Sequence, residues 1–349
     1  MRSTVFTPDE LTALYPTATS AYFMNPRTGA VSVDLASLSE CPADSSPVTE
    51  MLFKMPTNKE ERDEENKFND LVRYMFSRAP ALTSLHPEYS TLVVEYTEAT
   101  PTVVARRTDR ILVYRRFMTD MGTWNQCDTG TMSRMAAAVL RFLSVMHSHA
   151  YVHMDVKPDN VLCDLRDGAI SDVVLADYGL VYPMDDVFAA IAPRSAGGAD
   201  DEFDEGTCGF KSPLLRKNGE DSENRLFPIF TAVARGHPRL ASRISRAEER
   251  GRKNKKDGLN ALWMSYFSSR RNSIIRTPQD VAKVDLQSLG ISMVRMLPGN
   301  ECALLPSTAV DGTFRELVGR LLLCEKDSFY DATSALRYME QKRRKPGSV

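Results

Sequence analysis

Residues 151–164, YVHMDVKPDNVLCD, constrain this chain more than any other segment. They follow residues 129–150, where apolar side chains recur at helical spacing and predict an amphipathic helix. Five polar side chains suited to acid–base chemistry or metal binding then fall within eight positions, 153–160, together with one proline. A turn that caps a surface hairpin is the plain alternative, but the order and spacing of these side chains favour a catalytic site.

Composition sets the class of protein. The chain has 349 residues, 42% hydrophobic and 26% charged, so we expect a buried core in one large two-lobed domain or in two domains. Its net charge of -2 argues against nucleic acid as the main partner, because that role usually requires a basic excess.

The cysteines and the apolar segments indicate a compartment. Six cysteines are scattered without a C-x-x-C pair, which is typical of free thiols in a reducing environment. The first residues, MRSTVFTPDE, lack the apolar centre of a signal peptide, and no stretch has the length of a membrane helix. We therefore expect a soluble intracellular protein, cytoplasmic or nuclear, without a membrane partner.

The order of the expected elements predicts an α+β chain. Strand patterns occur at 20–36, where two strands flank a turn, and at 48–56, 90–99 and 109–117. A helical pattern covers 57–77, and from 129 onward the pattern is mostly helical. Five strands with one helix, followed by a helical remainder, predict two lobes of different structure.

Two stretches interrupt this layout. Residues 195–205, SAGGADDEFDE, are acidic and rich in glycine, so we expect a loop. Residues 246–258, RAEERGRKNKKDG, are basic and poor in apolar side chains, which favours a linker or an exposed helix end.

Phosphoryl transfer explains the residue types in the polar segment. That reaction needs a group that orients the attacking hydroxyl, cations on the phosphates, and oxygen ligands for Mg²⁺. Asp155 can accept the hydroxyl proton, and Lys157 can reach the transferred phosphate. Asn160, five residues after Asp155, and Asp177, after an apolar strand, can bind the metal.

This arrangement resembles the catalytic loop and the D-F-G segment of the protein kinase superfamily, with Tyr178 in place of phenylalanine. Residues 206–215, GTCGFKSPLL, resemble the segment that holds the peptide substrate. Residues 284–297 resemble the buried helix whose aspartate, here Asp285, anchors the catalytic loop. The expected phosphate-binding loop, in which Gly29 is the one glycine kept, and the unusual insertion at 215–283 also resemble those of kinases from large DNA viruses.

The resemblance implies a bilobal fold. A small N-lobe of five strands and one helix would cover residues 1–117, and a larger, mostly helical C-lobe would cover 118–343. An insertion after the substrate segment would occupy 215–283, followed at the end by a tail at 344–349. We expect protein substrates at the active site, and the insertion could hold a further protein partner.

The resemblance also assigns the binding of Mg²⁺ and ATP. Lys54 would hold the α- and β-phosphates, Leu162 would lie under adenine, and Gly29 is the one glycine left of the phosphate loop. The glutamate that holds the lysine would be Glu65, with residues 61 and 64 as rivals. Backbone groups at 115–117 would bind the adenine edge.

The same resemblance favours serine/threonine protein kinase activity, because Lys157 and Thr207 are placed to contact Asp155. Two differences from the kinase pattern bear on this activity: one argues against it, and the other suggests how it is regulated. Met24 and Pro26 occupy glycine positions of the phosphate loop, so a pseudokinase scaffold is the main alternative. Met154 replaces the arginine that binds a phosphate on the activation segment, which suggests activity without that switch. A small-molecule phosphotransferase is a third reading.

Overall fold

The structure is a computed structural model, and it describes residues 3–6, 8–25, 29–32, 52–56, 70–72, 74–76, 78, 89–99, 104–114, 119–120, 128–166, 169–191, 206–207, 210–215, 226–254, 258–297, 311–324 and 328–343. The chain forms two compact units. Unit 1 contains Met1–Ser77 and His86–Met118, and unit 2 contains Arg78–Leu85 and Thr119–Val349. The exact lobe limits, the insertion at 215–283 and the tail stay proposals.

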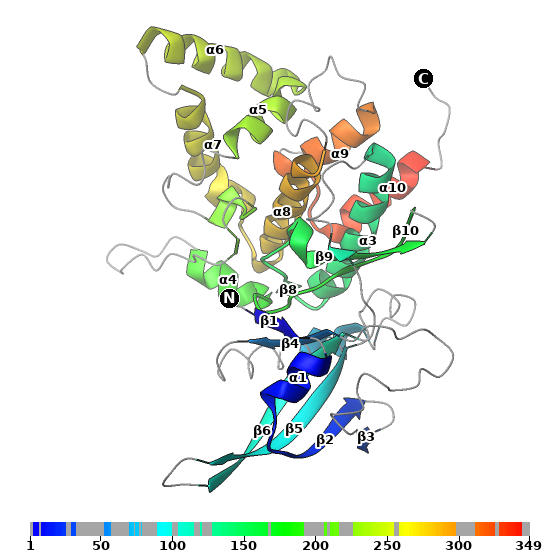
Figure 1. Ribbon diagram of the computed structural model, residues 1–349. Coiled ribbons are helices and arrows are strands. Elements are labelled where there is room, and N and C mark those ends of the chain that lie inside the picture. The colour runs from blue at the N-terminus through cyan, green and yellow to red at the C-terminus, as the bar shows by residue number, and fades with distance from the viewer. Residues whose placement is uncertain are drawn as a thin grey trace. The chain divides into compact units, whose positions relative to one another are not determined.

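Unit 1 is built on an antiparallel sheet with the strand order β1-β4-β6-β5-β2-β3 (Figure 1). Its strands are β1 (Ser3–Phe6), β2 (Ala18–Asn25), β3 (Gly29–Ser32), β4 (Leu52–Pro56), β5 (Tyr89–Ala99) and β6 (Val104–Tyr114). The longest pairing joins β5 and β6, where Leu92 and Ile111 lie opposite each other and both are fully buried.

The sequence predicted five strands for this unit, whereas the described residues form a sheet of six. The additional strand β1 has only four residues and pairs with β4, and the short helix α1 (Pro8–Leu14) follows it. Neither element is long enough to give a clear periodic signal, which is why the sequence did not indicate them. Of the helix expected at 57–77, the described residues 70–72 and 74–76 are helical, and Val72, Met75 and Phe76 are buried.

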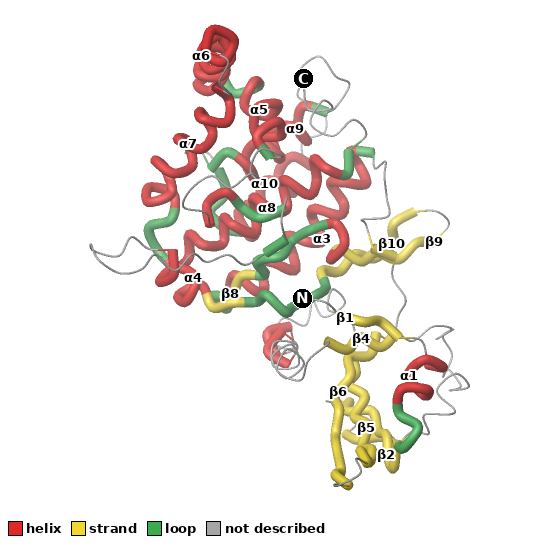
Figure 2. The backbone as a smooth tube through the Cα atoms, turned by 60° about the vertical axis from the view of Figure 1, so that its left-hand side comes forward, coloured by secondary structure: helices red, strands yellow, loops and turns green. Residues whose placement is uncertain are grey.

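Unit 2 is mostly helical (Figure 2). Its helices are α3 (Thr129–Ser148), α4 (Met184–Ile191), α5 (Phe227–Arg235), α6 (Pro238–Asn254), α7 (Gly258–Ile274), α8 (Ala282–Arg295), α9 (Gly312–Leu322) and α10 (Ala332–Arg343). Short strands accompany them: β7 (Thr119–Asp120), β9 (Val161–Arg166) and β10 (Ala169–Leu175) form one sheet, and β8 (Tyr151–Val152) pairs with β11 (Tyr182–Pro183).

Helices α3 and α8 form the centre of unit 2. Twelve residues of α3 and twelve of α8 are buried, and the two helices contact each other. Such wide burial explains why α8 has only a weak apolar stripe, because a helix covered on nearly all sides needs no polar face. The helix predicted at 129–150 is confirmed as α3.

The structure decides between the two interpretations of the basic run at 246–258. Most of it belongs to α6, so a linker was the wrong interpretation and an exposed helix was the right one. The neighbouring helices also contain a core that the sequence did not indicate. Trp263 and Tyr266 of α7 are 1% exposed and Phe230 of α5 is fully buried, and the rings of Phe230 and Trp263 lie 5.7 Å apart.

Candidate active site

Helix α3 delivers the chain to the polar segment. Asp128 caps its first turn by accepting hydrogen bonds from the Thr131 amide, at 2.9 Å, and the Thr131 hydroxyl, at 2.6 Å. These bonds lower the pKa of Asp128. After the helix ends, Ala150 takes a left-handed conformation with φ 60°, which reverses the chain into β8. The polar segment 153–160 therefore starts at a fixed point.

Asp285 of α8 holds this segment in place through hydrogen bonds to its backbone. Its side chain is fully buried, and it accepts hydrogen bonds from the amides of His153 and Met154, both at 2.9 Å. The Nε2 atom of His147 lies 3.0 Å from the same carboxylate. Met154 has a φ of 67°, a conformation that costs a non-glycine residue about 1–3 kcal/mol. The hydrogen bonds from the two backbone amides to Asp285 hold the backbone in this conformation.

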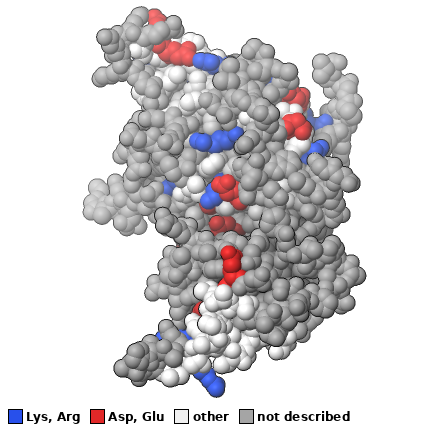
Figure 3. Space-filling view, in the orientation of Figure 1, with Lys and Arg blue, Asp and Glu red and all other residues white. Residues whose placement is uncertain are grey.

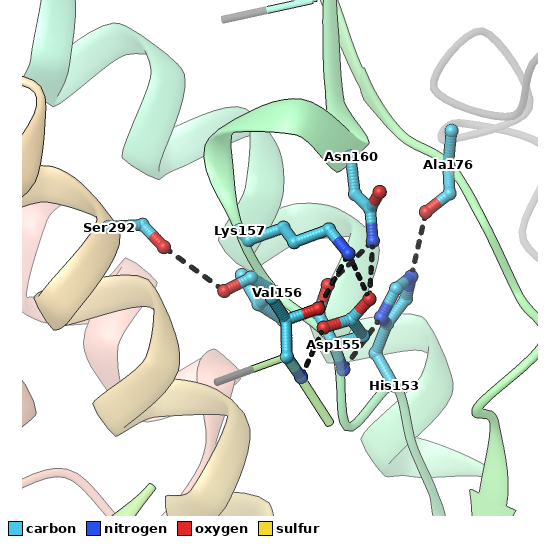
Figure 4. Close-up of polar contacts among 8 residues, drawn as sticks. His153, Asp155, Val156, Lys157, Asn160, Ala176 and Ser292 are labelled. Carbon is cyan, nitrogen blue, oxygen red and sulfur yellow. Dashed lines mark hydrogen bonds and ion pairs between the residues drawn. The ribbon is translucent and has the colours of Figure 1, made fainter. Parts of the chain in front are cut away.

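The side chain of Asp155 is fixed from three directions (Figure 4). Its Oδ2 atom accepts a hydrogen bond from Lys157 Nζ at 2.6 Å and another from Asn160 Nδ2 at 3.1 Å. Its Oδ1 atom accepts the Thr207 amide at 3.0 Å. Asp155 is only 6% exposed, so the carboxylate is nearly enclosed and its orientation is set before any substrate arrives.

Lys157 connects Asp155 to the segment 206–215. Its Nζ atom donates to Thr207 Oγ1 at 2.6 Å as well as to Asp155. Gly206, with a φ of 104°, precedes Thr207, and a Cβ atom at this glycine would lie 3.0 Å from the Met154 carbonyl oxygen. Only glycine permits this approach without strain, so the backbone places Thr207 beside Asp155 and Lys157.

His153 supports the loop from within rather than facing solvent. Its Nε2 atom lies 3.1 Å from the Ala176 carbonyl oxygen, and its Nδ1 atom accepts the Asp155 amide at 3.4 Å. Nε2 therefore carries the proton. Burial lowers the pKa of His153, although the nearby carboxylates, Asp285 first, oppose that effect. The histidine joins the loop to the end of β10 in its neutral form.

Asn160 directly precedes β9, and Asp177 follows the end of β10 by two residues. The Ala176 amide donates to the Asn160 carbonyl oxygen at 2.8 Å, which brings the residue before Asp177 next to Asn160. Because the side-chain nitrogen of Asn160 donates to Asp155, its amide oxygen is the side-chain atom that could bind a metal ion. An amide oxygen and a carboxylate are ligands that fit Mg²⁺, with phosphate oxygens completing the shell. Asp177 has a φ of 64°.

Helix α8 also holds the segment 206–215, through residues that the sequence reasoning missed. The Ser212 hydroxyl donates to Gln287 Oε1, and Gln287 Nε2 donates to the Leu322 carbonyl oxygen at 2.7 Å. The Ser292 hydroxyl donates to the Val156 carbonyl oxygen at 3.0 Å. One signal was present: polar residues in a buried, otherwise apolar helix need hydrogen-bond partners.

The remaining predicted residues belong partly to unit 2 and partly to unit 1. Leu162 is in β9, half-buried, opposite Val174 and Asp120. In unit 1, Lys54 belongs to β4 and lies opposite Val5 and Leu112. Gly29 begins β3. Glu65, its two rivals and the backbone at 115–117 lie outside the described residues. Their assigned roles stay predictions.

Comparisons with known proteins agree with the architecture of this site. The family described as protein kinase domain matches residues 58–188, which include α3, the polar segment and Asp177. Nucleosomal histone kinase 1 of Drosophila melanogaster is 33% identical over 76 residues, which are 20% of this chain and 13% of that protein. Over residues 58–188 the chain is therefore similar to protein kinases.

Two surface observations complete the description. Acidic and basic side chains are both visible across the described surface in Figure 3, so no single sign dominates that face. Within the residues that the structure describes, every helix is too short or too polar to cross a membrane.

Proposed function

We propose that this chain is a serine/threonine protein kinase, which transfers the γ-phosphate of ATP to hydroxyl groups of protein substrates. The observation that carries the proposal is the position of Lys157 Nζ, 2.6 Å from both Asp155 Oδ2 and Thr207 Oγ1. A lysine held between an enclosed carboxylate and a hydroxyl is positioned to meet the negative charge that develops on a transferred phosphoryl group.

Each residue then has a distinct task. Asp155 accepts the proton of the substrate hydroxyl and orients its oxygen. Lys157 stabilises charge on the transferred group, and Thr207 keeps the lysine directed toward the site. Asn160 and Asp177 hold Mg²⁺, which neutralises phosphate charge when bound. Lys54 of unit 1, held by a glutamate, would position the α- and β-phosphates, and Leu162 of unit 2 would lie under adenine.

The loop before Asp155 favours activity without an activating phosphate. Met154 is 1% exposed, so it fills the loop interior and offers no cation to a phosphorylated residue. The arrangement around Asp155 is therefore complete without that contact. A pseudokinase scaffold remains the second candidate function, because Gly29 is the only glycine kept in the phosphate loop.

The test is transfer of labelled phosphate from Mg-ATP to protein. The name of the Drosophila relative makes histones a reasonable first substrate, beside a generic basic protein. Wild type should label serine or threonine, and Asp155→Asn and Asp177→Asn should each abolish the label. Asp159→Asn is the matched control, because Asp159 is an exposed acid in the same loop. Stabilisation by Mg-ATP without transfer would instead support the scaffold, and label on tyrosine would contradict the assigned specificity.

A further inference from the structure

Helix α6 carries a row of basic residues that the proposed kinase chemistry does not use. Its sequence, PRLASRISRAEERGRKN, contains six basic and two acidic residues, so the helix has a net charge of +4 in a chain whose total is -2. The remaining residues therefore sum to -6. The total charge hides this local excess, because the basic residues are concentrated in one element.

The basic residues follow the helical repeat. Positions 239, 243, 246, 250 and 253 are separated by four, three, four and three residues. At 100° per residue these positions fall within an arc of about 80°, and at 1.5 Å per residue they extend over about 21 Å. We call this set the basic stripe. By their positions in the sequence, these residues form one row along a single side of the helix.

The three central arginines of the stripe are exposed, at positions 243, 246 and 250. Arg243 lies over the Tyr266 ring at 5.8 Å, while Arg246 and Arg250 donate to carbonyl oxygens of their own helix. In the part of the chain that the structure describes, none of the three forms an ion pair with a carboxylate. Glu248, on another face, is bound by Arg235 at 2.7 Å. Among the described residues, the charges of these three arginines are thus not neutralised by a carboxylate.

The other face of α6 is committed to the fold. Leu240, Ile244 and Ala247 are buried, and the helix contacts α5 and α7. Figures 1 and 2 both place α6 at the outer edge of unit 2. Because its apolar residues face inward, α6 cannot insert them into a membrane surface. The stripe also lacks aromatic residues of the kind that anchor protein interfaces.

From these observations we propose that α6 binds the phosphate backbone of duplex DNA without sequence preference. A duplex presents about one negative charge per 1.7 Å of its axis, so a straight row of cations finds phosphates in any register. An acidic protein would need carboxylates at matching positions. The contact uses none of the residues of the proposed active site.

The test measures binding of a fluorescently labelled duplex of about 20 base pairs to the full chain by anisotropy. If five phosphates are contacted, raising the salt from about 50 to about 200 mM should weaken binding about 500-fold; with two contacts left, the loss should be about 12-fold. The variant Arg243→Glu/Arg246→Glu/Arg250→Glu should bind far more weakly than wild type and have the shallower salt dependence.

A matched control comes from β6, where Arg106, Arg107 and Arg110 are also exposed. Reversing these three changes the net charge by the same amount and should leave duplex binding near the wild-type value. Circular dichroism checks that both variants are folded, and glutamine replaces glutamate if the stripe variant is not. The proposal is overturned if wild type does not bind the duplex or if both variants lose binding equally. It is also overturned if polyglutamate or phosphatidylserine vesicles bind the stripe and DNA does not.

Discussion

The imidazole of His147 lies 3.0 Å from the carboxylate of Asp285, Nε2 to Oδ2. The other ring nitrogen of His147 accepts the Ala332 amide, at 3.3 Å. Nε2 must therefore carry the proton and donate to Asp285. His147 thus joins α3, the start of α10 and the aspartate that holds the loop before Asp155.

Replacing His147 by alanine tests this connection. The change removes one donor to a buried carboxylate and leaves the Ala332 amide without its acceptor, so we expect a loss of about 2–4 kcal/mol in the free energy of unfolding. Urea denaturation measures it. Arg141→Ala, at an exposed position of the same helix, is the control and should change stability by less than about 0.5 kcal/mol. Equal losses would contradict a specific role for His147.

The contact between Lys157 and Thr207 makes a second prediction. Thr207→Val removes the oxygen that Lys157 contacts. It keeps the shape of the side chain and the hydrogen bond from the backbone N–H of residue 207 to Asp155. If the chain is a kinase, we expect kcat to fall about 10- to 100-fold, because the lysine is no longer directed toward the phosphate. Thr207→Ser keeps the hydroxyl and should retain most of the activity. Loss in both variants would point to packing rather than to the hydroxyl.

Asp280 gives a prediction of pH dependence. Its carboxylate accepts the amides of Arg276 and Thr277 at 3.0 Å and pairs with Lys283. Burial alone would raise the pKa of Asp280, but the bonds from Lys283 and the Arg276 amide outweigh it, and the pKa is lowered. The folded state therefore favours the charged form, so Asp280 stabilises the protein above the ordinary pKa of about 3.9 and loses this effect as the pH falls below it.

The measurement compares wild type with Asp280→Asn by denaturation at several pH values. At neutral pH the variant should be less stable by about 1 kcal/mol, the usual value for a lost cap. The difference should shrink as the pH falls toward 3, because wild type then loses its charge too. A difference that stays constant with pH would show that the charge of Asp280 contributes nothing.

The polar segment was predictable because its spacing is dictated by local geometry. Asp155, Lys157 and Asn160 lie within six residues, so one turn brings them together in any chain that folds this way. Thr207, about 50 residues further on, was predicted only from the resemblance of residues 206–215 to a kinase substrate segment, and the structure adds that Gly206, with a φ of 104°, permits the close approach. By contrast, Gln287 and Ser292 act through contacts with distant segments, which only packing reveals.

The same distinction explains the errors outside the site. Strand β1 pairs with β4, about 50 residues further along the chain, and a pairing over this distance leaves no periodic signal in four residues. The basic run at 246–258 left a linker and an exposed helix end open because most of its side chains are polar. Its helix exists because a few apolar residues, Leu240 and Ile244 among them, pack against neighbouring helices, and tertiary packing overrides composition.

Close packing of α8 on α9 predicts the effect of one added methyl group. In an ordinary helix interior, replacing glycine by alanine stabilises by up to about 1 kcal/mol. A Cβ atom at Gly290, however, would lie 2.9 Å from both Cγ and Cδ2 of Leu322 and 3.1 Å from Cβ of Leu321. We expect Gly290→Ala to destabilise the protein by about 1–3 kcal/mol, measured by thermal or urea unfolding.

A matched control for Gly290 lies in α9. At Gly319 the nearest atom to an added Cβ is Val233 Cγ1 at 3.6 Å, an ordinary van der Waals distance. Gly319→Ala should therefore be neutral or stabilising. The reverse order of the two variants would show that Leu322 can move aside and that the α8–α9 contact is less tight than its geometry indicates.

The hydrogen bond from Trp263 to Thr231 predicts how α5, α6 and α7 unfold. The indole nitrogen of Trp263 donates to the Thr231 hydroxyl at 2.9 Å, among the buried aromatic rings of α5 and α7. Tyr266 donates to the Leu323 carbonyl oxygen at 2.7 Å, and this bond connects α7 to the end of α9. These buried contacts predict that the three helices unfold together with the rest of unit 2.

Because the chain has only two tryptophans, Trp124→Phe makes Trp263 the sole reporter of this region. In that background the Trp263 fluorescence and the far-UV circular dichroism of the helices should change at the same urea concentration. Thr231→Val should then lower stability by about 1–3 kcal/mol, because it leaves a buried N–H without an acceptor. An earlier fluorescence transition would mean that α5–α7 fold as a separate unit, held only weakly to α9.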